Sequence, residues 1–150
     1  MYWSIDMKSP LFIFLLFFSI TITAQSVLDW SDFERGITWR EGTEGSTFPG
    51  FLEADFSDKL NNLEGKEVSL IGYLLVLDGS QSVYMLSKNP MASCFFCGNG
   101  GPETISEISF AEENTFRMDD LITVTGILRL NRKDPTRCYY LIEKAEAFGL

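Results

Sequence analysis

The chain has 150 residues, with 21 acidic and 12 basic side chains and a formal net charge of −9 at pH 7. A surface of this charge repels phosphate backbones and anionic lipids, which excludes nucleic acid as a favoured partner. The sequence contains no histidine. It therefore lacks the commonest metal ligand and the commonest general base, and Ser-His-Asp catalysis is excluded.

Residues 1–24 are typical of a signal peptide. Lys8 is followed by the apolar stretch LFIFLLFFSITIT, which is too short for a comfortable bilayer span. Ala24 precedes Gln25 at a plausible cleavage point, although Ile22, the third residue before the cut, is bulkier than the small residue usually preferred at that position. A retained membrane anchor is the alternative. We expect a periplasmic or secreted protein that starts near Gln25, without stable membrane insertion after cleavage.

The segment 25–55 has little regular periodicity and mixes aromatic residues with glycines and a proline. This pattern predicts an extended N-terminal arm. The aromatic side chains are expected to dock the arm on the domain that follows, with Trp30, Phe33 and Trp39 as anchors.

Residues 56–150 are predicted to form one mainly β domain. Ser57 is a typical N-cap and Gly65 a typical helix stop, so one short helix is expected between them. β-branched and apolar residues then recur in stretches separated by turn residues, as in strands. Five strands are predicted, at 67–77, 82–87, 104–110, 121–130 and 138–148.

These strands predict a small five-stranded barrel of the OB type. The long connections follow the second and third strands, and Gly72 and Gly126 lie inside the two longest strands, where glycine lets a strand bend. An open antiparallel sheet or sandwich is the alternative. In an OB barrel the third and fifth strands run parallel and adjacent. The loop before the third strand and Cys138, which opens the fifth, should therefore lie at the same end.

Four segments, LEGKEVSLIGYLLVLD, PMASCFFCGNGGPE, VTGILRLN and YYLIEKAEAF, resemble a group of exported bacterial proteins related to domain-of-unknown-function family 3299. The resemblance covers residues 56–148 and implies an exported accessory domain, sometimes encoded near transporter components. It implies as partner a membrane transporter component or another exported protein. The family pattern has one cysteine with a histidine two positions on, whereas this loop reads Cys94-Phe95-Phe96-Cys97. The one-cysteine site of the family therefore does not transfer.

Residues 90–103 place two of the three cysteines beside three glycines. A CxxC pair can be a redox dithiol, part of a metal site or a disulfide that braces a loop. A thiol-disulfide oxidoreductase places its first cysteine at a helix N-terminus. Glycine and proline follow Cys97 closely and do not propagate a helix, so an enzyme is the least favoured of the three.

A disulfide between Cys94 and Cys97 is the simplest alternative, because exported thiols meet oxidants by default. It would make the chain a structural protein-interaction module with a braced loop. This interpretation leaves Cys138 unpaired.

Metal binding uses more of these residues. Thiolates and thioethers select soft metals such as copper(I), and thiolates also bind zinc. Met91 lies three residues before the first cysteine and offers a thioether. The candidate metal ligands are therefore Met91, Cys94, Cys97 and Cys138.

Copper and zinc place different demands on this chain. Zinc normally takes four ligands, so a carboxylate such as Glu103 or Asp134 would have to join the three thiols, or the site would have to be shared between two chains. Copper(I) accepts two or three sulfurs. Asp119 and Asp120 are predicted to be turn residues before the fourth strand. We expect an exported accessory or binding domain that handles copper or zinc through its CxxC loop.

Overall fold

The structure, a computed structural model, describes residues 26–41, 52–78, 83–94 and 97–150. The predicted signal peptide lies outside these residues. The described chain is mainly β. The five strands of its main sheet that correspond to the prediction are β4 (Glu67–Asp78), β5 (Val83–Ser87), β6 (Ile105–Phe110), β7 (Leu121–Leu130) and β8 (Tyr140–Gly149). The five predicted strands are confirmed, with ends that differ by at most two residues.

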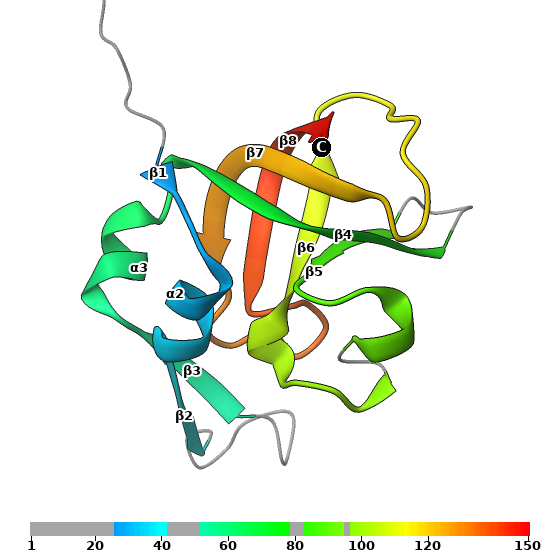
Figure 1. Ribbon diagram of the computed structural model, residues 1–150. Helices are drawn as coiled ribbons and strands as arrows, with labels where there is room; N and C mark the ends of the chain where they lie inside the picture. Colours follow the sequence, from blue (N-terminus) through cyan, green and yellow to red (C-terminus); the bar gives the residue numbers. More distant parts are fainter. Residues whose placement is uncertain (1–25, 42–51, 79–82, 95–96) are drawn as a thin grey trace, which may run out of the picture.

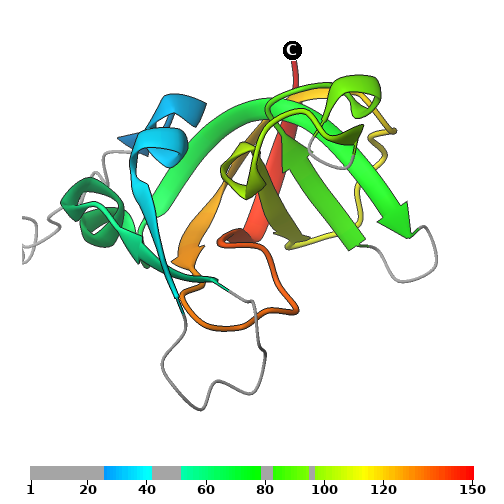
Figure 2. The same cartoon turned by 90° about the horizontal axis from the view of Figure 1, so that it is seen from below.

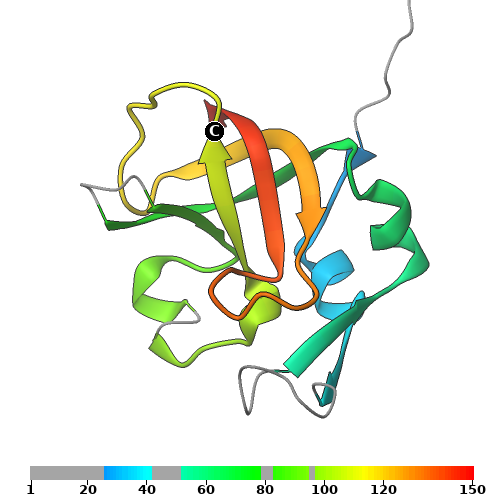
Figure 3. The same cartoon turned by 180° about the vertical axis from the view of Figure 1, so that it is seen from behind.

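These strands close into a barrel, which Figures 1 and 3 show from opposite sides. β4 pairs antiparallel with β5 and with β7, β5 pairs antiparallel with β6, and β7 pairs antiparallel with β8. β6 and β8 pair in parallel. This is the expected OB-like order, with the third and fifth barrel strands as parallel neighbours.

The barrel is filled by side chains that alternate along each strand. In β7 the inward positions are Ile122, Val124, Gly126, Leu128 and Leu130, and all five are buried. The residues between them are exposed or half-buried. This period of two is why the β7 pattern could be recognised in the sequence.

The segment predicted as an extended arm contains regular structure. β1 (Ser26–Val27) pairs in parallel with β4, and α2 (Trp30–Arg35) follows it. β2 (Ile37–Glu41) and β3 (Leu52–Phe56) form a separate antiparallel pair. The chain therefore has a second short helix and three strands that the sequence analysis did not predict.

A capping box starts α2. Asp29 is the N-cap, and its carboxylate accepts a 2.8 Å hydrogen bond from the Ser31 amide, while Asp32 accepts a 3.1 Å bond from the Asp29 amide. These two bonds satisfy amides that have no partner within the helix. With six residues the helix is too short to show an apolar period in the sequence, and the cap was its only local signal.

The aromatic residues of this segment dock on the barrel as expected. Trp30 and Phe33 are buried, with 8% and 0% of their surface exposed. Trp39 remains 37% exposed, although its ring lies edge-on to that of Tyr139, with 4.6 Å between ring centroids. Two of the three expected anchors are therefore core residues, and the third, Trp39, packs against Tyr139 at the surface.

The predicted helix after Ser57 is confirmed as α3 (Asp58–Leu63). The Ser57 hydroxyl accepts a hydrogen bond from the Leu60 amide, and Gly65 ends the turn with a φ of 79°. Leu60 is fully buried and joins α3 to the core.

Several connections lie at one end of the barrel, which Figure 2 views directly. α2, the β5–β6 connection and the β7–β8 connection are all found there (Figures 1 and 2). Pro102 from the first connection and Cys138 from the second line the same hollow. The expectation that these two connections share one end is therefore confirmed.

Among the described residues, no helix is both long enough and apolar enough to cross a bilayer.

Candidate functional site

The sulfur loop is the connection 88–104 between β5 and β6, of which residues 95 and 96 lie outside the described chain. Its described part includes the 3₁₀ turns Met91–Ser93 and Pro102–Thr104. Gly98 and Gly100 between them have φ values of 84° and 87°, which side-chain-bearing residues rarely adopt. No α-helix begins in the described part of this loop. The described part of the loop therefore supplies no helix dipole of the kind that activates the first cysteine of an oxidoreductase.

Met91 lies against both cysteines of the CxxC pair. The Cys94 sulfur is 3.9 Å from the Met91 thioether sulfur. The Cys97 thiol donates a 3.0 Å hydrogen bond to the Met91 carbonyl. Cys94 is completely buried, whereas Cys97 is exposed. Two sulfurs of the loop are thus in contact, and the third, at the exposed Cys97, lies against the main chain of Met91.

Backbone hydrogen bonds fix this arrangement. The Met91 carbonyl accepts from the Cys94 amide at 3.4 Å, and the Cys94 carbonyl accepts from the amides of Cys97 at 3.0 Å and Asn99 at 3.3 Å. Two consecutive turns therefore hold the spacing between the cysteines. Because these bonds involve only the main chain, the turn should survive substitution of either thiol.

Asp119 attaches the sulfur loop to the barrel. Its carboxylate accepts a 2.7 Å hydrogen bond from the Met91 amide, and its own amide donates a 2.8 Å bond to the Leu74 carbonyl of β4. Asp119 has a φ of 67°, a left-handed conformation that aspartate adopts more readily than most residues. Asp119 is a turn residue, as predicted, but its hydrogen bond to Met91, 28 positions away, was not predicted.

Cys138 belongs to a different sulfur pair. Strand β8 starts at Tyr140, so Cys138 lies in the β7–β8 connection and not in a strand as predicted. Its sulfur is 4.0 Å from the thioether sulfur of Met85 in β5. Burial raises the pKa of the Cys138 thiol to about 12, because the thiolate would lose its hydration.

The four-ligand zinc set considered from the sequence is not assembled. Within the described residues, no three side chains among cysteine, histidine, aspartate and glutamate lie close enough together to hold a metal ion. Glu103 folds back onto the Gly101 amide at 3.1 Å, and Asp134 accepts hydrogen bonds from the amide and hydroxyl of Thr136. Both carboxylates are thus used locally, and the three thiols are free.

No protein-family model, curated protein or solved structure matches this chain. The class of this protein is therefore described by its fold and its candidate site. The chain is a mainly β protein with a closed, OB-like five-stranded barrel, and a sulfur-bearing loop lies at one end of that barrel.

Proposed function

We propose that this protein is an exported accessory domain that binds a soft transition metal, copper(I) foremost, through Met91, Cys94 and Cys97. The observation that carries the proposal is that Met91 contacts both thiols: its thioether sulfur is 3.9 Å from the Cys94 sulfur, and its carbonyl oxygen is 3.0 Å from the Cys97 sulfur.

The three groups match the coordination that copper(I) accepts. Copper(I) prefers thiolates and thioethers and is satisfied by two or three of them, whereas zinc normally takes four ligands. On binding, Cys94 and Cys97 each lose the proton of the thiol, so two protons are released to solvent. The hydrogen bond from Cys97 to the Met91 carbonyl is then lost, and the Met91 amide stays held by Asp119.

The exposure of the two thiols suggests an order of exchange. Cys97 is exposed and would be the first thiol that a donor or acceptor protein reaches. Cys94 is buried and, with Met91, would shield the ion from water and oxidants. Unequal exposure of this kind suits transfer of a metal more than permanent storage.

The compartment and the partner in this proposal rest on the sequence. The apolar segment before Gln25 supports export to the periplasm or the medium. The resemblance to family 3299 supports a transporter component or another exported protein as the exchange partner.

The proposal is tested by copper(I) titration of the exported chain under anaerobic conditions, against a chromophoric copper(I) chelator. We expect one copper(I) per chain, with about 100-fold weaker binding in Cys94→Ser and Cys97→Ser and about tenfold weaker binding in Met91→Leu. Cys138→Ser is the matched control and should bind within about threefold of the native chain. Equal loss in all three cysteine variants, or no binding by a chain with three free thiols, would overturn the proposal.

A second candidate is favoured by the tight turn between the cysteines. The 3.0 Å bond from the Cys97 amide to the Cys94 carbonyl holds the backbones of the two residues close together, although both thiols are free in the structure and a disulfide would require their side chains to move. The chain would then be a structural interaction module with a braced loop. A thiol count on the chain purified from its compartment separates the candidates, because a brace leaves one free thiol, whereas a metal site at Cys94 and Cys97 leaves all three thiols reduced.

A further inference from the structure

Two adjoining hollows, both lined by residues of β5 and β6, form a groove. Their volumes are about 640 Å³ and about 470 Å³, and both are lined by Val83, Glu107 and Arg137. The β7–β8 connection forms one wall of the smaller hollow. The second and third strands and this connection are the part of an OB barrel at which ligands bind. The groove is separate from the metal ligands proposed above.

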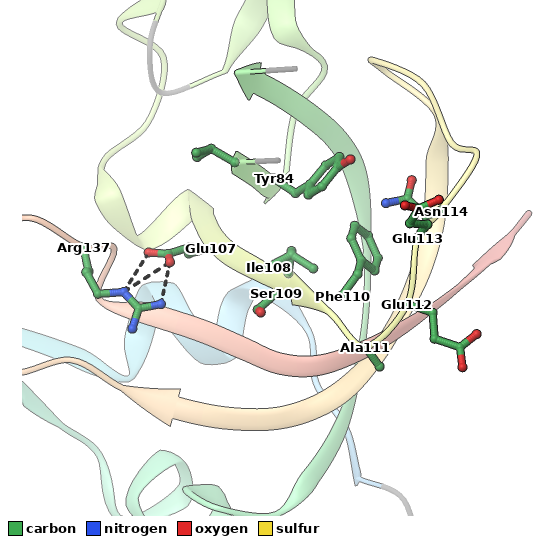
Figure 4. A pocket seen from close by; sticks show the side chains of 11 residues that line it. Tyr84, Glu107, Ile108, Ser109, Phe110, Ala111, Glu112, Glu113, Asn114 and Arg137 are labelled. Atoms are coloured by element: carbon green, nitrogen blue, oxygen red, sulfur yellow. Dashed lines mark hydrogen bonds and ion pairs between the residues drawn. The ribbon is translucent and has the colours of Figure 1, made fainter. Parts of the chain in front are cut away.

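The larger hollow, shown in Figure 4, combines aromatic rings with carboxylates. The rings of Tyr84 and Phe110 meet edge to face, with 5.1 Å between their centroids. In Figure 4 the Arg137–Glu107 pair lies on one side of these rings, and Glu113 lies on the other. A long side chain that crosses the rings would therefore reach a carboxylate.

The charges in the groove favour a cation. The Arg137 Nε donates to both carboxylate oxygens of Glu107, at 3.2 and 3.3 Å, and this bonding raises the pKa of Arg137. The guanidinium is thus neutralised by its own partner. Glu112 and Glu113 are exposed, and no basic side chain of the described residues forms an ion pair with either of them. These two carboxylates add to the chain's net charge of −9.

The smaller hollow is mainly apolar. Val83 and Met85 of β5, Ile105 of β6 and Pro135 of the β7–β8 connection contribute aliphatic surface. The contact between the sulfurs of Met85 and Cys138 lies at this wall. This hollow suits an uncharged aliphatic side chain.

We propose that the groove binds an extended basic segment of a partner protein. A lysine or arginine of the partner lies with its aliphatic stem along Tyr84 and Phe110 and its charge at Glu112 and Glu113, as cation–π and ionic contacts favour. An aliphatic side chain of the same segment fills the smaller hollow. The excess of carboxylates disfavours the phosphates of a nucleic acid.

The test uses fluorescently labelled octapeptides and the exported chain. The probes are alternating lysine and valine, alternating lysine and serine, and alternating glutamate and valine, with a thymidine oligonucleotide and cellohexaose as the other classes of ligand. We expect the lysine–valine peptide to bind, with about tenfold weaker binding of the lysine–serine peptide and no binding of the other three probes. Fluorescence anisotropy gives the affinities, and amide chemical shifts should change in β5 and β6.

Variants locate the binding on the groove. Replacing both Glu112 and Glu113 by glutamine should weaken binding of the lysine–valine peptide about tenfold, and Val83→Thr should weaken it severalfold. The control replaces Asp58 by asparagine and Glu67 by glutamine, which removes two exposed charges elsewhere and should change binding less than twofold. Equal loss in the control, no binding of any peptide, or tighter binding of the oligonucleotide or cellohexaose would overturn the proposal.

Discussion

The hydroxyl of Tyr140 donates a 2.9 Å hydrogen bond to the backbone carbonyl of Phe33, and the rings of the same two residues stack with 4.0 Å between centroids. Both residues are completely buried, although 107 positions separate them in the sequence. Tyr140 opens β8 and Phe33 lies in α2, so this pair joins the N-terminal segment to the last strand of the barrel. Trp30 adds a second link, because its indole nitrogen donates to the Ile71 carbonyl of β4 at 2.7 Å.

Truncation of the Phe33 side chain should strongly destabilise the barrel. Phe33→Ala leaves a cavity between α2 and β8, and we expect it to lower the free energy of unfolding by about 3–5 kcal/mol. Tyr140→Phe keeps the stacked rings and removes one hydroxyl, so its expected cost is about 1 kcal/mol. Urea denaturation followed by tryptophan fluorescence measures both. Equal stability of the Phe33→Ala and native chains would mean that α2 is not part of the cooperative fold.

The glycine inside β7 is required by close packing. A Cβ at Gly126 would lie 2.7 Å from both the Glu143 carbonyl oxygen and a side-chain carbon of Ile142 in the neighbouring strand. Because one of these atoms is backbone, Gly126→Ala should cost about 1–3 kcal/mol. Gly149→Ala is the control, since its nearest neighbour would be a Phe116 carbon at 3.7 Å, an ordinary contact. Thermal unfolding should show a clear loss for the first variant and little change for the second.

Glu64 should make stability depend on pH. Its carboxylate accepts a 2.9 Å bond from the guanidinium of Arg132, together with bonds from a second Arg132 nitrogen and from the Leu130 amide, and these lower its pKa below the ordinary 4.5. A carboxyl with a lowered folded-state pKa stabilises the fold above the unfolded pKa, and the stabilisation is lost as the pH falls through the folded value.

The measurement compares the native chain with Glu64→Gln at pH 7 and pH 3. The ion pair is about one-third exposed, so we expect the variant to be less stable by only about 1 kcal/mol at pH 7, with a smaller difference at pH 3. Glu67→Gln, which removes an exposed carboxylate at the start of β4, is the matched control. A difference between native and Glu64→Gln chains that grows towards pH 3 would contradict the assignment.

The barrel was predictable because its signals are local. Apolar residues recur every second position in β4 and β7, and Gly72 and Gly126 interrupt both strands at inward, buried positions. The order of strands then followed from the two long connections. The elements that were missed are α2 with six residues, β1 with two, and β2 and β3 with five each. Stretches this short carry too few residues for a period to be recognised.

The site was predictable only as a set of residue types. The spacing of Met91, Cys94 and Cys97 indicated that their sulfurs could meet, because all three lie in one loop. Contacts between residues that are far apart in the sequence could not be inferred from spacing. Asp119 reaches Met91 from another connection, and Met85 reaches Cys138 from another strand, and both contacts depend on how the barrel closes.

The three thiols should differ widely in reactivity. Cys97 is exposed, whereas Cys94 is completely buried and Cys138 is partly buried with a pKa of about 12. At pH 8 only roughly one Cys138 side chain in ten thousand would be a thiolate, the form that reacts with disulfide reagents. A reduced, desalted and metal-free chain should therefore show one fast thiol with Ellman's reagent, and the other two should react after denaturation.

The identity of the fast thiol follows from single variants. Cys97→Ser should abolish the fast phase, and Cys138→Ser should leave it intact. Because a thiol with a pKa of about 12 is far from full ionisation, the slow reaction assigned to Cys138 should accelerate about tenfold for each pH unit up to pH 10. Loss of the fast phase in Cys138→Ser would show that this thiol is accessible and ionised. The Met85–Cys138 contact would then not be the buried sulfur pair that the structure describes.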